Sequence, residues 1–253
     1  MNTKFIFLGT GTSQGVPTIG CKCDVCTSSN TKDKRLRSSV YIEYEGLKVV
    51  IDAGPDFRQQ LLRENIDYLD AVILTHNHKD HTGGLDDVRA FNYLYNKDFP
   101  LYAENYVFDS LKKEYYYVFA ENKYPGIPEF EINTISNIEF YIKGIKITPI
   151  RAFHNKLPVL GYRIGDIAYI TDASFIPEEE FQKLKGLKLF VINAVRIEKH
   201  LSHFSLPEAI EVCQKVKAEK SYITHISHQM GKHDDIVLPP RIELSFDGLK
   251  LFS

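Results

Sequence analysis

The fold and the chemistry of this chain are decided by the stretch THNHKDHTGG, residues 75–84. It directly follows four apolar residues that we predict to form a β-strand. His76 and His78 are two residues apart, so on extended backbone their side chains point the same way. Asp80 and His81 follow in a loop that can turn back toward them. Four ligand-type side chains within six positions predict a metal site, and imidazole with carboxylate suits zinc, iron or manganese.

Length and composition indicate a globular protein. The chain has 253 residues, of which 43% are hydrophobic and 25% charged, and no low-complexity linker interrupts it, so we expect a single domain over residues 1–253. Lys and Arg number 31 against 33 Asp and Glu, and this net charge of −2 disfavours nucleic acid as the partner. No apolar run approaches about 18 residues, and Gly9 interrupts the short one near the start. We therefore expect no membrane span, no signal peptide and a cytoplasmic location.

Hydrophobic periodicity predicts strands and helices that alternate in two similar halves. Apolar residues recur at helical spacing, which predicts helices at 56–65, 85–95, 106–120, 177–185 and 206–218. Strands are expected at 4–8, 39–44, 47–51, 71–74, 130–135, 138–142, 145–150, 160–164, 167–170, 189–195 and 222–224, with a final hairpin over 241–252. This pattern indicates an α/β fold of two sheets with helices outside.

The spacing H-x-H-x-D-H at 76–81 resembles the signature of the metallo-β-lactamase superfamily. The resemblance implies an αββα sandwich of two mixed sheets with helices on the outer faces and a dinuclear metal site at the sheet ends. It implies further ligands later in the chain: a histidine, a bridging aspartate and a final histidine. The ligands implied for two divalent ions, zinc or manganese, are His76, His78, Asp80, His81, His154, Asp172 and His225. The superfamily's di-iron oxidoreductases have glutamate where this chain has His78, so this histidine favours hydrolysis.

Three of the four cysteines lie in one loop, at Cys21, Cys23 and Cys26. In a cytosolic chain, clustered thiols favour a metal over a disulfide. A tetrahedral structural zinc needs a fourth ligand, and the candidates are His228 and Cys213. We favour His228, because Cys213 lies on the apolar stripe of a predicted helix, where a buried free thiol is common. The alternative is a reduced cysteine loop without metal.

Three segments resemble one branch of the superfamily. The turn LGTGTS at 8–13, the C-x-C-x-x-C loop and THISHQ at 224–229 are similar to the cyclic-phosphate phosphodiesterases of phosphonate degradation. The cysteine loop is also similar to that of the pyrroloquinoline quinone synthesis protein, and the glycine turn to that of the tRNA 3′-processing endonucleases. Those endonucleases carry an additional basic arm for tRNA, and no Gly- and Lys-rich insertion of that kind is visible here. The sequence therefore disfavours tRNA as a substrate.

His203 and Asp80 are the residues that the resemblance places in the chemistry. In the phosphodiesterase branch a histidine followed by a small hydroxyl residue precedes the last helix, and His203, with Ser205 close behind it, resembles that histidine. Histidine titrates near neutral pH, which suits a general acid that protonates the leaving oxygen. His200 is the alternative for this role. Asp80 both binds metal and orients the nucleophile.

The complete ligand set predicts a metal-dependent hydrolase with two active-site ions and one structural zinc. We expect a phosphodiesterase whose partner is a small-molecule phosphate ester, such as a cyclic nucleotide or a ribose phosphate. The alternatives are a thioesterase similar to glyoxalase II and a non-catalytic cofactor-biosynthesis protein related to pyrroloquinoline quinone synthesis. A tyrosine-rich stretch, residues 93–124, predicts core packing, with an aromatic lid or a homodimer surface as the alternatives.

Overall fold

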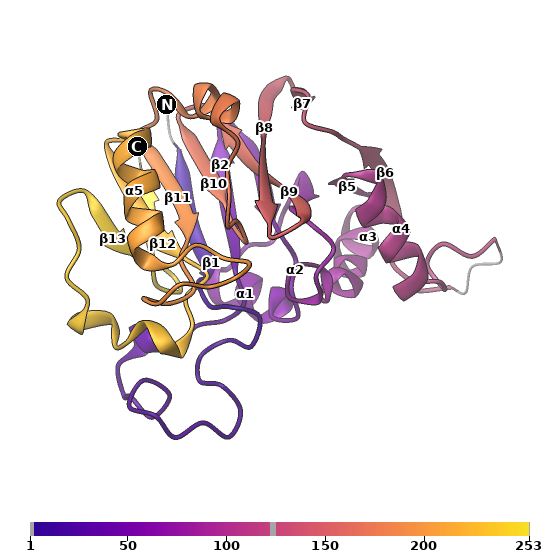
Figure 1. Cartoon of the computed structure of the whole chain (residues 1–253). Coiled ribbons are helices and arrows are strands. Elements are labelled where there is room, and N and C mark those ends of the chain that lie inside the picture. The colour runs from indigo at the N-terminus through magenta and orange to yellow at the C-terminus, as the bar shows by residue number, and fades with distance from the viewer. Residues whose placement is uncertain (1–2, 122–124, 253) are drawn as a thin grey trace.

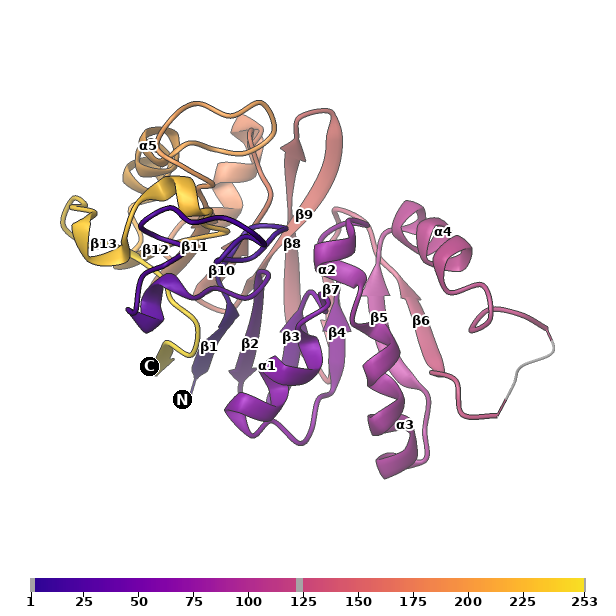
Figure 2. The same ribbon diagram turned by 90° about the horizontal axis from the view of Figure 1, so that it is seen from below.

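Two seven-stranded β-sheets pack face to face with helices on both outer surfaces (Figures 1 and 2). The computed structural model describes residues 3–121 and 125–252. The first sheet runs through β14 (Lys250–Phe252), β1 (Lys4–Gly9), β2 (Ser39–Tyr44), β3 (Leu47–Ile51), β4 (Ala71–Ile73), β5 (Phe99–Ala103) and β6 (Phe130–Thr134). The second runs through β13 (Ile242–Leu244), β12 (Lys220–Thr224), β11 (Leu189–Asn193), β10 (Ile167–Ile170), β9 (Leu157–Ile164), β8 (Ile145–His154) and β7 (Phe140–Ile142). Both sheets mix parallel and antiparallel pairs, which confirms the predicted sandwich.

The central strands, such as β10 and β11, are apolar on both faces because each sheet is covered on both sides. In β10, Tyr169 points into the core between the sheets, whereas Ala168 and Ile170 point toward the outer helix layer. Phe7 of the first sheet and Tyr222 of the second meet in the central core, with 5.4 Å between their ring centroids. A shared core of this kind fixes the two sheets, and therefore the loops at their ends, relative to each other.

Helices cover the outer face of each sheet. The α-helices are α1 (Phe57–Glu64), α2 (Lys79–Thr82), α3 (Arg89–Tyr95), α4 (Asn105–Glu114) and α5 (Leu206–Val216). The 3₁₀ helices are η1 (Thr31–Asp33), η2 (Leu85–Val88), η3 (Glu178–Leu184), η4 (His228–Met230) and η5 (His233–Asp235). α1, α3 and α4 share a buried apolar cluster with the first sheet, and α5 shares one with the second (Figure 2).

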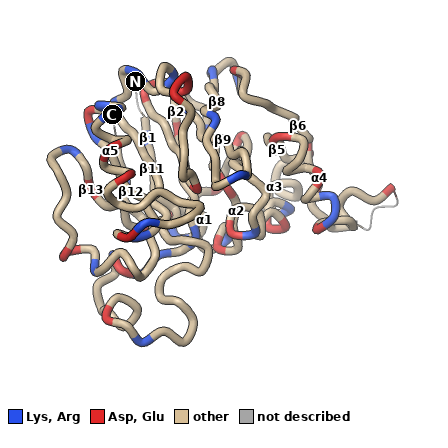
Figure 3. The backbone as a smooth tube through the Cα atoms, viewed as in Figure 1, with Lys and Arg blue, Asp and Glu red and all other residues tan. Residues whose placement is uncertain are grey.

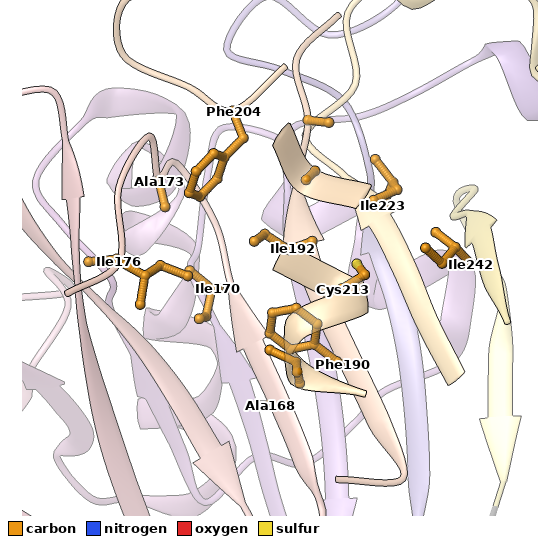
Figure 4. Packing of buried hydrophobic residues seen from close by; sticks show 14 of the residues in the cluster. Ala168, Ile170, Ala173, Ile176, Phe190, Ile192, Phe204, Cys213, Ile223 and Ile242 are labelled. Atoms are coloured by element: carbon orange, nitrogen blue, oxygen red, sulfur yellow. The ribbon is translucent and has the colours of Figure 1, made fainter. Parts of the chain in front are cut away.

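α5 shows how the sequence sets a helix and its buried face. It begins with a capping box, in which the Ser205 backbone N–H donates to the Glu208 carboxylate at 2.9 Å. Ala209 and Cys213 lie on the stripe that packs on the sheet, and Figure 4 shows Cys213 close to Phe190. Burial raises the pKa of the Cys213 thiol to about 12. Cys213 is therefore a core residue.

The C-terminal tail is not the hairpin that the sequence predicts over 241–252. β13 pairs in parallel with β12 of the second sheet, whereas β14 pairs antiparallel with β1 of the first. The two strands therefore belong to different sheets, and β14 pairs with a strand at the other end of the chain, so local turn signals mislead here. β5 is a further strand that the sequence pattern does not predict, and its Pro100 weakens the strand signal.

The predicted helices at 106–120 and 177–185 also differ from the structure. α4 ends at Glu114 because Tyr115 turns into the core, where its hydroxyl donates to the Thr82 carbonyl at 2.9 Å. The segment 177–185 forms the 3₁₀ helix η3 instead of an α-helix. In the tyrosine-rich stretch Tyr116 is exposed, and Tyr124 lies outside the described residues.

The loops that carry the predicted ligands meet at one end of the sandwich, the lower edge of Figure 1. They follow β4, β10 and β12, and the parallel pairing of β10, β11 and β12 brings three strand ends to the same edge. Acidic and basic residues are interspersed along the described chain (Figure 3). None of the described helices is long and apolar enough to cross a membrane.

Candidate metal centre

The histidines of residues 75–84 form the wall of the site. His76 and His81 are fully buried, and the ring centroids of His76 lie 4.5 Å from His78 and 4.3 Å from His81. α2 begins immediately after His78 and turns the chain back, so that Asp80 and His81 face the same space. The Nε2 atom of His81 lies 3.2 Å from the Asp80 carboxylate. The structure therefore brings together all four side chains of the signature.

Asp172 lies at the centre of the predicted ligands. Its Oδ2 atom is 3.7 Å from Nε2 of His76 and 3.3 Å from Nε2 of His81, and its Oδ1 atom is 3.0 Å from Nδ1 of His225. One group of donor atoms within 4.8 Å consists of Asp80, His81, Asp172 and His225, and another of His76, His78 and Asp172. One carboxylate that belongs to both groups is the arrangement expected of a bridging ligand.

Two of the predicted ligands follow strands and sit in unusual backbone conformations. Asp172 directly follows Thr171 at the end of β10 with φ of 59°, and His225 follows β12 with φ of 57°. Non-glycine residues adopt this left-handed region at a cost, and such residues concentrate at functional sites. At each of these two residues the left-handed backbone turns the side chain away from the strand direction and toward the other predicted ligands.

His154, at the end of β8, completes the set from the second sheet. Its ring centroid lies 5.0 Å from that of His78, and its donor atom groups with Asp172 and His203. The Nδ1 atom of His154 donates to the Ser202 carbonyl at 2.6 Å. A backbone acceptor at Nδ1 fixes the tautomer and leaves Nε2 unprotonated, as a metal ligand requires.

Buried polar groups without a protein partner indicate whether the site fits metal ions. The Nε2 atom of His76 is buried and has no hydrogen-bond partner among the described residues, a costly state that a bound cation would relieve. Burial opposes ionisation of Asp172, but His225 and His81 outweigh it and hold the pKa of this carboxyl well below its usual range. Burial likewise opposes protonation of His81, yet the surrounding carboxylates raise its pKa well above the usual value. The carboxylates that hold a proton on Nε2 of His81 would attract a divalent cation to the same place.

Asp52 is a functional residue that the sequence reasoning missed. It directly follows β3 with φ of 66°, it is fully buried, and its Oδ2 atom lies 2.7 Å from Nδ1 of His81. Its Oδ1 atom accepts the backbone N–H of Thr75 at 2.8 Å. A carboxylate behind a ligating histidine orients the ring and raises its basicity. An acid at the end of an apolar strand, the signal that pointed to Asp172, was available for Asp52 as well.

His203 lies closer to the predicted ligands than the sequence implied. Its ring centroid is 4.5 Å from that of His154 and 4.8 Å from that of His225, and its Nδ1 atom is buried without a partner among the described residues. Burial lowers the pKa of His203 to about 3. His200 lies farther out, 5.1 Å from His203 between ring centroids, and belongs to none of the donor groups.

Cys21, Cys23, Cys26 and His228 form a second cluster, with all four donor atoms within 4.8 Å. Nδ1 of His228 lies 3.4 Å from Sγ of Cys21 and 3.3 Å from Sγ of Cys23. The Cys26 backbone N–H lowers the pKa of Cys23 to about 6, whereas burial raises that of Cys26 to about 11. Three thiols and one imidazole are the donor set of a structural zinc site. Cys213, the alternative fourth ligand, lies on the buried face of α5.

The profile of the beta-lactamase superfamily domain matches residues 48–226, and the chain belongs to this superfamily, in its metallo-β-lactamase form. A curated protein named octanoyltransferase, from Porphyromonas gingivalis, is 42% identical over 252 residues; the match covers 98% of this chain and 51% of that protein. The chain therefore spans about half the length of this relative. Coenzyme PQQ synthesis protein B from Methylobacterium radiotolerans is 30% identical over 122 residues, which cover 43% of this chain and 39% of that protein.

Solved structures agree with this assignment. A structure described as a new diphosphatase from the PhnP family is 40% identical, has a TM-score of 0.93 and covers 100% of this chain and 98% of its own. Zinc-bound PqqB from Methylobacterium extorquens, at 18% identity, has a TM-score of 0.76 over 98% of this chain and 99% of its own. The second likeness concerns the fold alone.

Proposed function

We propose that this protein is a metal-dependent hydrolase that cleaves a phosphodiester bond in a small substrate. The observation that carries the proposal is the convergence of six donor residues on one shared carboxylate, Asp172, with His203 beside them. The full-length likeness to a diphosphatase of the PhnP family supports phosphoryl chemistry. The ligands in this proposal are His76, His78, Asp80, His81, His154, Asp172 and His225, as the sequence predicted.

Two divalent ions bound by these residues would polarise a phosphoryl oxygen and lower the pKa of a water molecule. The protein's own groups then set the geometry. Asp52 holds the ring of His81 through the 2.7 Å contact, and the Ser202 carbonyl holds His154. Asp80 lies next to His81 and is placed to accept a hydrogen bond from the attacking water.

His203 is the proposed general acid for the leaving oxygen. With a pKa near 3 the ring is neutral at pH 7, so it needs an anionic partner before it can donate a proton. A negative charge within a few ångströms favours the protonated form of histidine. The phosphate group of the substrate provides that charge, and His203 is then protonated when substrate is bound.

A second candidate, hydrolysis of an acyl thioester, is favoured by one observation. Nearly the whole chain matches half of a protein named octanoyltransferase, whose name refers to acyl transfer. The same donor set can act on a thioester carbonyl, because a metal ion polarises carbonyl and phosphoryl oxygens alike. The test of the proposal must therefore include an octanoyl thioester.

The experiment measures the rate of hydrolysis of four substrates by protein of known metal content. The substrates are bis-p-nitrophenyl phosphate, a cyclic ribose phosphate, a dinucleotide with a diphosphate bridge and an octanoyl thioester. We expect phosphodiester turnover, up to three metal ions per chain, and loss of both turnover and active-site metal in Asp172→Asn. Faster hydrolysis of the thioester than of every phosphate substrate would favour the second candidate. Absence of phosphate turnover in protein with both active-site ions bound would refute the proposal, and metal analysis that never exceeds one ion per chain would refute the ligand assignment.

A further inference from the structure

The loop at 196–205, between β11 and α5, carries both His200 and His203. Hydrogen bonds close its base, from the Val195 N–H to the Phe204 carbonyl at 3.1 Å and from the Leu206 N–H to the Arg196 carbonyl at 2.8 Å. Between these ends, residues 197–203 make no backbone-to-backbone hydrogen bond with any described residue. The conformation of this segment must therefore be held by side chains.

Two side chains hold the carbonyl groups of the loop. Arg196 donates from Nη2 to the Lys199 carbonyl at 2.8 Å and from Nε to the Glu198 carbonyl at 3.3 Å. His154 donates to the Ser202 carbonyl at 2.6 Å. The first contact folds the loop back on its own start, and the second joins it to a predicted metal ligand. Any movement of the loop therefore displaces both the general acid and a ligand.

Arg196 also links the loop to the cysteine cluster. Its Nη1 atom donates to the Oε1 atom of Gln229 at 3.1 Å. Gln229 lies in η4 directly after His228, which packs against Cys21 and Cys23. One guanidinium group thus bridges the segment that the cysteine site organises and the loop that carries His203. Its planar arrangement of donors suits several acceptors at once, which a lysine ammonium cannot match.

We propose that Arg196 is a positioning residue that holds the 196–205 loop, and with it His203, in the arrangement used for catalysis. The proposal rests on the function proposed above only for its effect on turnover; the restraint on the loop is a property of the protein alone. The cysteine site then has a second role beyond stability. It fixes the segment that carries Gln229, and Gln229 in turn holds Arg196.

A matched control is available in Arg163. Its guanidinium also binds backbone carbonyls, that of Gly165 at 2.8 Å and that of Lys183 in η3 at 2.7 Å, but at the end of β9 that points away from His154. Arg163→Ala therefore removes a comparable set of hydrogen bonds without touching the site.

The loop offers a readout that needs no substrate. Trypsin cleaves after Lys199, and the carbonyl of that peptide bond is the acceptor of the 2.8 Å bond from Arg196. Arg196→Ala should speed this cleavage by roughly tenfold, since proteolysis follows the population of the open loop. It should lower kcat by about 10- to 100-fold, the usual cost of misplacing a catalytic group by about 1 Å, with KM little changed. Gln229→Ala should also speed the cleavage and lower kcat, in each case by a smaller factor than Arg196→Ala.

We expect Arg163→Ala to leave cleavage after Lys199 and kcat at the wild-type level. Wild-type cleavage at Lys199 in both Arg196→Ala and Gln229→Ala would overturn the restraint. Faster cleavage with an unchanged kcat would overturn the positioning role while leaving the proposed hydrolase intact. If the wild type hydrolysed no phosphate ester, the cleavage assay would still decide whether Arg196 holds the loop. Gln229→Ala keeps the test valid should Arg196→Ala fold poorly, which the thermal melting temperature reports.

Discussion

The variant His203→Ala separates the chemistry of the site from its metal binding. At pH 7 an imidazole with a pKa near 3 is protonated in only about one molecule in 10⁴. A general acid contributes about 10²- to 10⁴-fold to the rate, so a fraction this small would cancel its benefit. The proposed mechanism therefore requires the bound phosphate to raise the pKa of His203. As the pH increases through this raised value, the ring loses its proton and kcat should fall.

The assay measures kcat against pH for a diester with an alkyl leaving group and for one with p-nitrophenolate. We expect His203→Ala to keep its metal content, to lose about 10²- to 10⁴-fold on the alkyl ester and less on the p-nitrophenyl ester, and to lack the alkaline fall in kcat. His200→Ala is the matched control and should lose much less, because His200 lies 5.1 Å from His203 between ring centroids and belongs to none of the donor groups. Near-wild-type rates of His203→Ala on the alkyl ester would remove it from the mechanism. Loss of an active-site ion from His203→Ala would instead make it a ligand, consistent with its grouping with His154 and Asp172.

Two further predictions concern groups away from the reacting atoms. Cys23→Ser should release one zinc and lower the melting temperature, because a structural metal contributes to folding. Its turnover should fall no further than that of Arg196→Ala. Abolished turnover with unchanged zinc content and melting temperature would contradict this prediction. Asp247 accepts hydrogen bonds from the N–H and hydroxyl of Thr10, and burial raises its pKa to about 6. Its pKa is lower in the unfolded chain, so the folded state binds its proton more tightly and the free energy of unfolding should fall by about 3 kcal/mol between about pH 4 and pH 6. Urea unfolding of wild type and Asp247→Asn at several pH values checks this, and parallel pH profiles for the two proteins would refute it.

The architecture was largely predictable because its signals are local. Apolar runs such as β10 and β11 are continuous since both faces of each sheet are covered, and the predicted α/β sandwich is the result. The error at the C-terminal tail has a non-local cause. β13 and β14 lie close together in the sequence but pair with β12 and β1, and nothing between them marks the change of sheet.

The sequence by itself determined the chemistry that depends on spacing. His76 and His78 share one side of an extended segment, and the C-x-C-x-x-C loop brings three thiols together whatever surrounds them. The sequence also favoured His228 over Cys213 as the fourth donor, and the structure groups His228 with the three thiols and buries Cys213 on the inner face of α5.

Only the tertiary structure decided which groups support those ligands. Asp52 meets His81 across 29 positions of the sequence, and the acceptor that fixes His154 is the backbone carbonyl of residue 202, which no side-chain pattern can encode. The sequence leaves His200 and His203 as rivals, whereas the fold of the loop places His203 nearer to Asp172. The physical reason is that the residue types at the ends of the strands are written in the sequence, whereas the orientation of each side chain depends on contacts that exist only after the two sheets have packed together.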